Sequence, residues 1–292
     1  MRIGVIIRPR EGMGELRALR AGVAELRRRG HEVRPRLTFE SGDGMRLARG
    51  MARAGAELVI AAGGDGTVNE VVNGVLAVKW DGRVGVVPLG TANDFAAGME
   101  IPSSIPEAFG VAVGGRSVSV DVGRVNRRYF VNVSTGGFGA SATEETPSES
   151  KKLLGPWAYV ITGVKKFAEL RPSRARFESE GETAYEGEVM LFAVGNGKRT
   201  GGGSMLTPRA EFGDGKLDVL IVPGMARMDF LSLVPDLRAG THVDNPDILY
   251  FRTGRLVVES EELLSVNADG EPLRGREFTY ELADRTITLM TP

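Results

Sequence analysis

The chain has 292 residues, of which 42% are hydrophobic and 26% are charged, a composition typical of a globular protein with sizeable cores. Its 37 basic and 38 acidic side chains leave a formal charge of −1, which argues against a protein that coats nucleic acid or another polyanion. With no cysteine and two histidines, the sequence excludes disulfides, thiolate nucleophiles, cysteine-bound zinc, iron–sulfur clusters and multi-histidine metal sites.

The first third of the chain alternates strand-like and helix-like segments. Residues 3–7 form a short apolar run, as in a strand that is covered on both faces. Apolar residues then recur at three- and four-residue spacing over 16–26, which predicts an amphipathic helix that ends at Gly30. The alternating order predicts a parallel sheet with right-handed crossovers. Further strands are expected at 33–37, 58–62 and 84–87, and further helices at 45–54 and 68–76.

Beyond Val118 the pattern changes to short alternating segments separated by Gly, Asp-Gly and Pro, which is typical of an antiparallel sheet or sandwich. We therefore predict an α/β N-terminal domain with a parallel sheet over 1–120 and an all-β antiparallel sandwich domain over 121–292, leaving open that the last strand returns to the first domain. A single helix is expected over 151–170. Strands are expected at 118–125, 129–133, 174–178, 189–194, 217–222, 255–259, 278–282 and 286–290.

The sequence shows neither an export signal nor a membrane span. Only residues 3–7 separate Arg2 from Arg8, fewer than the about 7–15 apolar residues of a signal peptide. No stretch approaches the roughly 18 apolar residues that cross a bilayer. We therefore expect a cytoplasmic protein whose contacts with a membrane are peripheral.

The segment Gly63-Gly64-Asp65-Gly66-Thr67-Val68-Asn69-Glu70 follows the third predicted strand and opens the third helix. Glycines there let the backbone approach a ligand, and the N–H groups of a helix start attract an anion. Because Asp65 would repel a bare phosphate, the segment favours a magnesium–nucleotide. Thr67 and Glu70 also match a T-x-x-E capping box. The alternative is a tight, well-capped turn, and neither a P-loop nor a G-x-G-x-x-G pattern is met.

A second loop, Pro88-Leu89-Gly90-Thr91-Ala92-Asn93-Asp94-Phe95, follows the fourth predicted strand. It lies at the carboxyl end of a parallel strand, where open α/β sheets bind their ligands. Thr91 offers a hydrogen bond to a nucleotide, and Asp94 adds a second carboxylate beside Asp65. The alternative is a structural loop in which Asn93 and Asp94 cap the next helix.

Together, residues 63–71 and 88–96 resemble the diacylglycerol kinase catalytic-domain family, and most of all its bacterial YegS-like lipid kinases. The resemblance implies a two-domain fold of the NAD-kinase and diacylglycerol-kinase type, with the nucleotide in a cleft between the domains. It also implies ATP-dependent phosphorylation of a lipid hydroxyl. It extends over nearly the whole chain, with similar segments at 135–139, 143–147, 195–197, 201–203, 244–246 and 267–272.

The resemblance assigns roles to individual positions. It implies an acidic network of Asp65, Asp94 and Asp121, and a divalent-cation site formed by the Asp214 carboxylate with the backbone carbonyls of Glu211 and Lys216. Asp214-Gly215 also reads as a hairpin turn, and a turn suits coordination by backbone oxygens, so both interpretations can hold. The implied nucleotide contacts are Thr38, Gly64, Asp65, Gly66, Thr67, Val68, Asn69, Glu70, Thr91 and Asp94.

The catalytic base is expected within Asp269-Gly270-Glu271, since phosphoryl transfer needs a carboxylate to accept the hydroxyl proton. Glu271 matches the family's usual proton acceptor, and Asp269 is a rival for the same role. Without the resemblance, Asp269-Gly270 would be interpreted as a plain turn. The run Arg8-Pro9-Arg10-Glu11-Gly12 departs from the Asn-Pro-x-Ser/Gly-Gly stretch of many relatives, which puts the contribution of that loop in doubt.

The segment 151–170 carries an apolar stripe with Trp157 and lysines at both ends. Such a helix can lie at a membrane interface, although packing against a sheet is the commoner use of an apolar stripe.

The leading hypothesis is a lipid kinase that uses ATP and Mg²⁺, with Ca²⁺ as an alternative at the second-domain cation site. The expected acceptor is diacylglycerol, phosphatidylglycerol or a related lipid, reached at the inner membrane surface by transient contact. No nucleic-acid partner is expected, and a homodimer is left open. The alternatives are an NAD kinase, which shares the GGDGT loop, and a non-catalytic nucleotide or lipid sensor.

Overall fold

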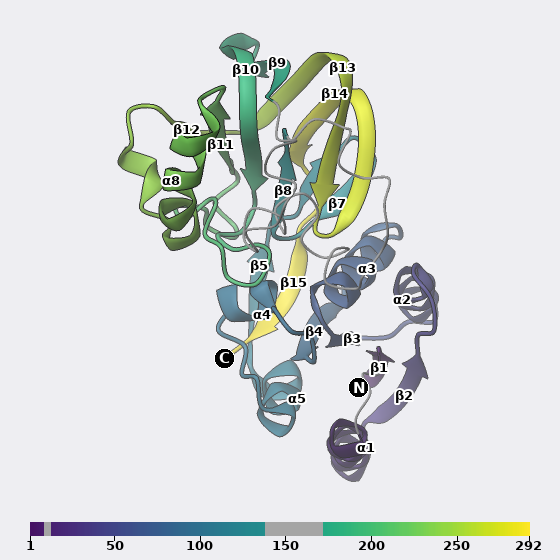
Figure 1. Cartoon of the computed structure of the whole chain (residues 1–292). Coiled ribbons are helices and arrows are strands. Elements are labelled where there is room, and N and C mark those ends of the chain that lie inside the picture. The colour runs from purple at the N-terminus through teal and green to yellow at the C-terminus, as the bar shows by residue number, and fades with distance from the viewer. Residues whose placement is uncertain (9–12, 138–171) are drawn as a thin grey trace. The chain divides into compact units, whose positions relative to one another are not determined.

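The computed structural model describes residues 1–8, 13–137 and 172–292, which form two compact units (Figure 1). The first unit consists of residues 1–120 and 285–292, and the second of residues 121–284. The helix expected over 151–170, most of the Arg8–Gly12 loop, and the motif at 143–147 lie outside the described residues.

A six-stranded sheet with the order β2-β1-β3-β4-β15-β5 forms the centre of the first unit. Its first four strands run parallel, which confirms the predicted α/β fold, and β15 pairs parallel with β4 and antiparallel with β5. The last strand of the chain therefore completes the first sheet. The strands are β1 (Arg2–Ile7), β2 (Glu32–Leu37), β3 (Leu58–Gly63), β4 (Arg83–Pro88), β5 (Arg116–Val120) and β15 (Ile287–Thr291).

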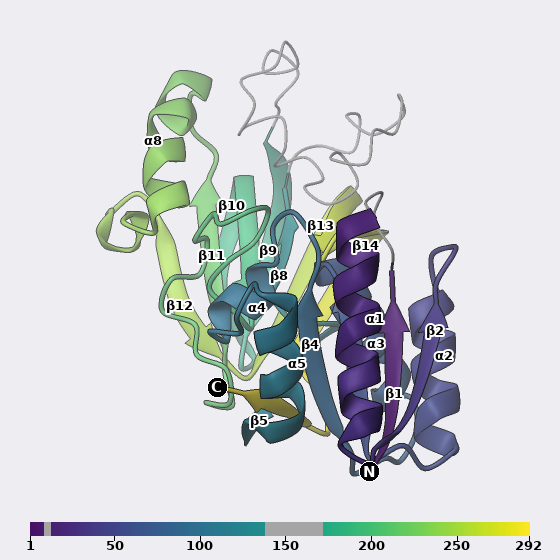
Figure 2. The ribbon, with the colours of Figure 1, turned by 90° about the horizontal axis from the view of Figure 1, so that it is seen from below.

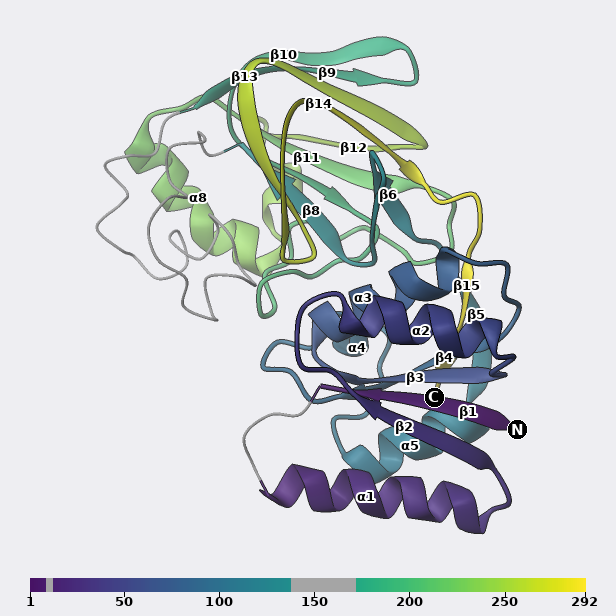
Figure 3. The same ribbon diagram turned by 90° about the vertical axis from the view of Figure 1, so that its right-hand side faces the viewer.

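Helices cover both faces of this sheet. Helices α2 (Asp43–Arg53) and α3 (Asp65–Leu76) lie on one face, and α1 (Met13–Arg28) and α5 (Ile105–Gly114) lie on the other (Figures 2 and 3). Gly74 lets α3 approach α2, because a Cβ there would overlap the carbonyl of Met45. The short helix α4 (Asp94–Gly98) follows the loop after β4. Among the described residues, no helix has both the length and the apolar character needed to cross a membrane.

The second unit is an antiparallel nine-stranded sheet with the order β12-β11-β10-β8-β13-β14-β6-β7, and β9 pairs with both β10 and β13. This arrangement confirms the predicted antiparallel sandwich. The strands are β6 (Gly123–Val125), β7 (Arg128–Phe130), β8 (Val133–Gly136), β9 (Ser173–Ser179), β10 (Glu182–Gly195), β11 (Leu217–Pro223), β12 (Leu249–Thr253), β13 (Arg255–Ala268) and β14 (Glu271–Leu282).

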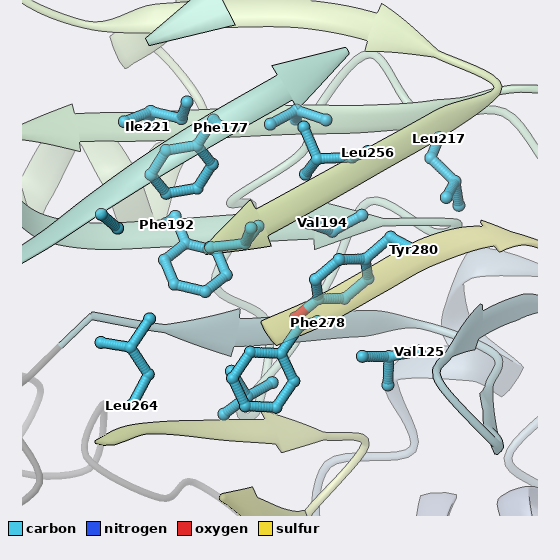
Figure 4. Close-up of a cluster of buried hydrophobic side chains, with 14 of the residues drawn as sticks. Val125, Phe177, Phe192, Val194, Leu217, Ile221, Leu256, Leu264, Phe278 and Tyr280 are labelled. Carbon is cyan, nitrogen blue, oxygen red and sulfur yellow. The ribbon is translucent and has the colours of Figure 1, made fainter. Parts of the chain in front are cut away.

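Side chains from the inner faces of these strands form one hydrophobic cluster (Figure 4). The rings of Phe177 and Phe192 meet edge to face at 5.2 Å between centroids, a favourable aromatic geometry. The hydroxyl of Tyr280, fully buried in the cluster, is hydrogen-bonded to Ser134.

The structure adds a helix to the second unit. Helix α8 (Arg227–Ala239) buries Phe230, Leu233 and Leu237 in a second cluster against β8, β10 and β11. The 3-10 turn η3 (His242–Asp244) follows it.

Candidate active site

Two loops of the first unit meet through their glycine backbones at the carboxyl ends of β3 and β4. A Cβ on Gly64 would lie 3.0 Å from the Cα of Gly90, and a Cβ on Gly90 would lie 2.6 Å from the Cα of Gly64. The N–H of Leu89 donates to the carbonyl of Gly63 at 2.9 Å, which keeps the two strand ends in step. The two predicted loops therefore lie against each other, and a side chain at either glycine would push the loops apart.

Asp65 connects the same two loops through its carboxylate. Its Oδ1 accepts the N–H of Phe95 at 2.9 Å, and Phe95 and Asp94 are both buried. Asn93 adopts a left-handed conformation, with φ at 52°. Its side-chain amide accepts from the N–H of Gly90 and donates to the Gly90 carbonyl, so it closes its own loop and does not cap α4. The alternative in which the side chain of Asn93 caps the next helix is thus wrong.

Helix α3 begins at Asp65, with Gly64 in extended conformation before it and no side-chain cap. The predicted capping box is therefore wrong, because Thr67 is the third residue of the helix and the Glu70 carboxylate bonds to a different loop. The first N–H groups of α3 lack a side-chain cap, which leaves an anion-attracting helix start after the glycines.

The hydroxyl of Thr67 is a buried polar group at this helix start. Thr67 is 3% exposed, and its Oγ1 has no hydrogen-bond partner within the described part of the chain. The side chain packs over Gly63, whose missing Cβ makes the room. A buried hydroxyl without a partner costs free energy, so this position suits a group that bonds Oγ1 when bound. A phosphate oxygen on the helix N-terminus meets that requirement.

Glu70 fixes the loop between β2 and α2. Its carboxylate accepts the N–H groups of Gly42 and Gly44, each at 2.8 Å, and is buried. Gly44 leaves room for this contact, because a Cβ there would displace the Glu70 carboxylate. Both oxygens of the Glu70 carboxylate are therefore hydrogen-bonded to the loop that follows Thr38.

Asp43 closes the same loop from within. It accepts the N–H groups of Phe39 and Glu40 and pairs with Arg46 at 2.6 Å. The hydrogen bond from Phe39 and the guanidinium of Arg46 hold the pKa of Asp43 below its ordinary value. Thr38 is buried, and its N–H donates to the carbonyl of Ile7, so it lies beside the end of β1.

Replacing Glu70 with alanine should lower the free energy of unfolding by about 3 kcal/mol, because two buried N–H groups lose a charged acceptor. Glutamine should cost less, since its amide oxygen still accepts one bond. Denaturant unfolding of both variants, beside a Glu107→Ala control at an exposed position of α5, measures this effect. Equal midpoints for Glu70→Ala and the control would contradict the assignment.

The remaining predicted nucleotide residues divide into buried and exposed ones. Val68 and Asn69 are buried within α3, and Asn73 donates to both the carbonyl and the amide oxygen of Asn69. Gly66 is half-buried in the first turn, and Thr91 is exposed on the second loop. Val68 and Asn69 therefore shape the helix, whereas Gly66 is partly accessible and Thr91 lies at the surface.

In the second unit, Asp269-Gly270 forms the tight turn between β13 and β14. Both residues have positive φ, 49° and 92°, as a two-residue type I′ hairpin requires. The carboxylate of Asp269 accepts backbone N–H groups from Val131, Asn132 and Val133. Its oxygens are thus engaged in holding the connection between β7 and β8.

Glu271 has a different environment one residue beyond the turn. Its Oε2 lies 3.3 Å from the guanidinium of Arg128 on β7, and its side chain is 36% exposed. The two rival carboxylates therefore differ in their surroundings. Asp269 is hydrogen-bonded to backbone N–H groups, whereas Glu271 is partly exposed and pairs with Arg128. No motif pointed to Arg128 in the sequence.

Asp121 and Asp214 are connected through a turn of the second unit. Asp121 accepts the N–H of Gly215 at 2.8 Å, and its carbonyl accepts the side chain of Asn196. Asp214 accepts the N–H of Lys216 at 2.9 Å and pairs with Arg252. Glu211 and Lys216 are exposed, and the described residues contain no group of three or more His, Asp or Glu side chains suited to a metal ion.

Two family models together match nearly the whole chain. The diacylglycerol kinase catalytic domain matches residues 2–125, and the YegS C-terminal NAD kinase beta sandwich-like domain matches residues 132–291.

Curated relatives and solved structures agree with this match. A Chromohalobacter salexigens protein named "Probable lipid kinase YegS-like" is 38% identical over 95% of this chain and 90% of its own length. "Probable lipid kinase YegS" of Escherichia coli O127:H6 is 34% identical over 94% of this chain and 91% of its own. A crystal structure of a "putative diacylglycerol kinase" from Bacillus anthracis superposes with a TM-score of 0.84 at 26% identity, covering 100% of this chain and 95% of that one.

Proposed function

This chain belongs to the YegS-like lipid kinases of the diacylglycerol kinase family, and from this premise we propose that it transfers the γ-phosphate of ATP to a hydroxyl group of a lipid. Both curated relatives carry lipid-kinase names, so the alternative of an NAD kinase is not favoured.

The observation that carries the proposal is the unpartnered hydroxyl of Thr67 in the first turn of α3. The uncapped helix start and Oγ1 together offer donors to a phosphate group. The touching backbones of Gly64 and Gly90 keep side chains away from the ligand. This arrangement suits the polyphosphate of a nucleotide.

Asp65 makes a divalent cation part of the proposed substrate. A carboxylate at a phosphate-binding helix start repels a bare polyphosphate, and a cation bound with ATP offsets that repulsion. Asp65, with Asp94 beside it on the second loop, is the residue we assign to this cation. A cation held by Asp65 would supply positive charge to the phosphates during phosphoryl transfer.

We assign the role of proton acceptor to Glu271. The acceptor hydroxyl must lose its proton as it attacks, and a half-exposed carboxylate can take it. Asp269 suits this role less, because backbone N–H groups already engage its oxygens. Arg128 pairs with one oxygen of the Glu271 carboxylate. The proposed acceptors remain diacylglycerol, phosphatidylglycerol or a related lipid.

Thr67→Val should raise the Kd for ATP about tenfold, because the bound phosphate loses a hydrogen bond from Oγ1. The melting temperature should stay the same or rise, since the change removes a buried hydroxyl that makes no hydrogen bond among the described residues. Thr67→Ser keeps the hydroxyl and should bind ATP as the wild type does. Calorimetric titration with ATP and MgCl₂ measures all three proteins. Unchanged affinity in Thr67→Val would place the phosphates elsewhere, and NAD binding in preference to ATP would reject the proposed donor.

A further inference from the structure

A buried carboxylate faces an arginine across two strands of the second unit. Asp218 on β11 is 0% exposed, and the antiparallel register places it directly opposite Arg252 on β12. Directly opposed residues of an antiparallel pair have side chains on the same face of the sheet. Arg252 itself is about half exposed, with 47% of its side chain accessible. Its guanidinium therefore covers a fully buried acid.

Two carboxylates share this guanidinium. The Nε of Arg252 lies 3.6 Å from Oδ2 of Asp218, and a terminal nitrogen pairs with Oδ2 of Asp214. Tyr250, two residues before Arg252, donates to Oδ1 of Asp218 at 2.8 Å. Oδ2 of Asp218 has no hydrogen bond to any described residue, and Arg252 is the described cation that pairs with it. Burial raises the pKa of Asp218 above its ordinary value, and the charges of Arg209 and Lys198 act in the opposite direction.

Asp214 is the carboxylate that the family resemblance assigns to a divalent cation, and its donors do not fit one here. One oxygen accepts the N–H of Lys216, and the other pairs with Arg252. A cation would have to displace a guanidinium that already compensates two carboxylates, one of them buried. Buried carboxylates need such compensation, and a guanidinium bridges two acids with its fork of donors.

We infer that Arg252 takes the place of a divalent cation in the second unit, as a permanent counter-ion for Asp214 and Asp218. The arginine fixes the Asp214-Gly215 turn, and the N–H of Gly215 in turn holds the carboxylate of Asp121 at 2.8 Å. The second unit therefore keeps this turn, and the orientation of Asp121, without a bound metal.

The test compares melting temperatures of the nucleotide-free full chain in EDTA, in MgCl₂ and in CaCl₂. The test variants are Arg252→Met and the double variant Arg252→Met/Asp218→Asn. The control is Arg255→Met, which removes an exposed arginine of β13, the next strand along the chain. Should Arg252→Met fail to fold, Arg252→Lys replaces it, because a single ammonium cannot span both acids. Calorimetric titration with CaCl₂ adds a direct measure of binding.

Wild type and Arg255→Met should melt at one temperature in all three solutions. Arg252→Met should melt on the order of 10 °C lower in EDTA, because it leaves a buried charge unpaired. Added CaCl₂ or the Asp218→Asn replacement should restore much of that loss, and Arg252→Met should gain Ca²⁺ binding that wild type lacks.

Three results would overturn the inference. The first is a wild-type melting temperature that falls in EDTA and recovers with cation. The second is an Arg252→Met variant as stable as wild type. The third is a loss of stability that neither cation nor Asp218→Asn reverses, which would mean that Arg252 acts by packing. None of these results tests ATP binding at α3. The inference about Arg252 can therefore fail while the proposed function holds, and the reverse.

Discussion

Glu271→Gln is expected to lower kcat for lipid phosphorylation by about 10²- to 10⁴-fold, the range typical of losing a general base. Glutamine keeps the size of the side chain and an oxygen for Arg128, but it cannot accept the hydroxyl proton. The Kd for ATP should stay that of the wild type, because we assign Glu271 to the proton of the lipid hydroxyl and the binding of the phosphates to the start of α3. Steady-state kinetics and ATP titration of the same preparation measure both quantities.

Asp269→Asn is the matched control for Glu271. Its amide oxygen can accept only part of the three backbone N–H bonds, so the free energy of unfolding should fall by about 1–3 kcal/mol. Its kcat per folded molecule should stay within a few-fold of wild type. A wild-type kcat in Glu271→Gln, together with an inactive but folded Asp269→Asn, would reverse the assignment and make Asp269 the base.

Asp65→Asn is expected to reduce kcat/KM for MgATP on the order of 10²-fold, since it removes the charge that we assign to the cation. The amide oxygen can still accept the N–H of Phe95, so the two loops should stay joined and the melting temperature should change little. Asp81→Asn, at a side chain that is 90% exposed in the first unit, is the control.

The dependence on cation concentration separates a charge effect from a structural one. Asp65→Asn should need more MgCl₂ for half-maximal rate than wild type or Asp81→Asn, because its site attracts the cation less. A variant with wild-type kinetics at every MgCl₂ concentration would remove Asp65 from the mechanism. A variant that loses activity only in proportion to its folded fraction would make Asp65 a purely structural link between the loops.

Most strands and the first three helices could be predicted from periodicity, whereas α4 and α5 were not among the predicted helices. The short apolar runs at 3–7 and 58–62 are buried central strands, and the spacing over 16–26 is a helix on one face of the sheet. Helix α8 was harder to recognise, because Pro235 interrupts its apolar spacing and a β-rich sequence surrounds it. Its three buried residues gain their stability from packing on the sheet, which local sequence does not reveal.

The sequence predicts where in the fold the site lies, but it does not predict most of the hydrogen bonds and ion pairs within the site. Consecutive parallel strands end at one edge, so the two glycine loops had to meet there. The hydrogen-bond partner of a carboxylate can lie far away along the chain. Glu70 accepts the backbone N–H groups of Gly42 and Gly44, 28 and 26 residues earlier, and not those at the start of its own helix. Arg128 and Arg252 belong to no motif. The register of β11 and β12 places Arg252 opposite Asp218, and the fold of the second unit brings Arg128 to Glu271.

The central claim is most directly tested by transfer of the labelled γ-phosphate of ATP, with MgCl₂ present, to a panel of lipids in mixed micelles and to NAD in parallel. We expect label on a hydroxylated lipid, none on NAD, and loss of lipid labelling in Glu271→Gln. Label on NAD alone would contradict the account, as would the absence of labelled lipid from a protein that binds ATP, which would favour a nucleotide sensor.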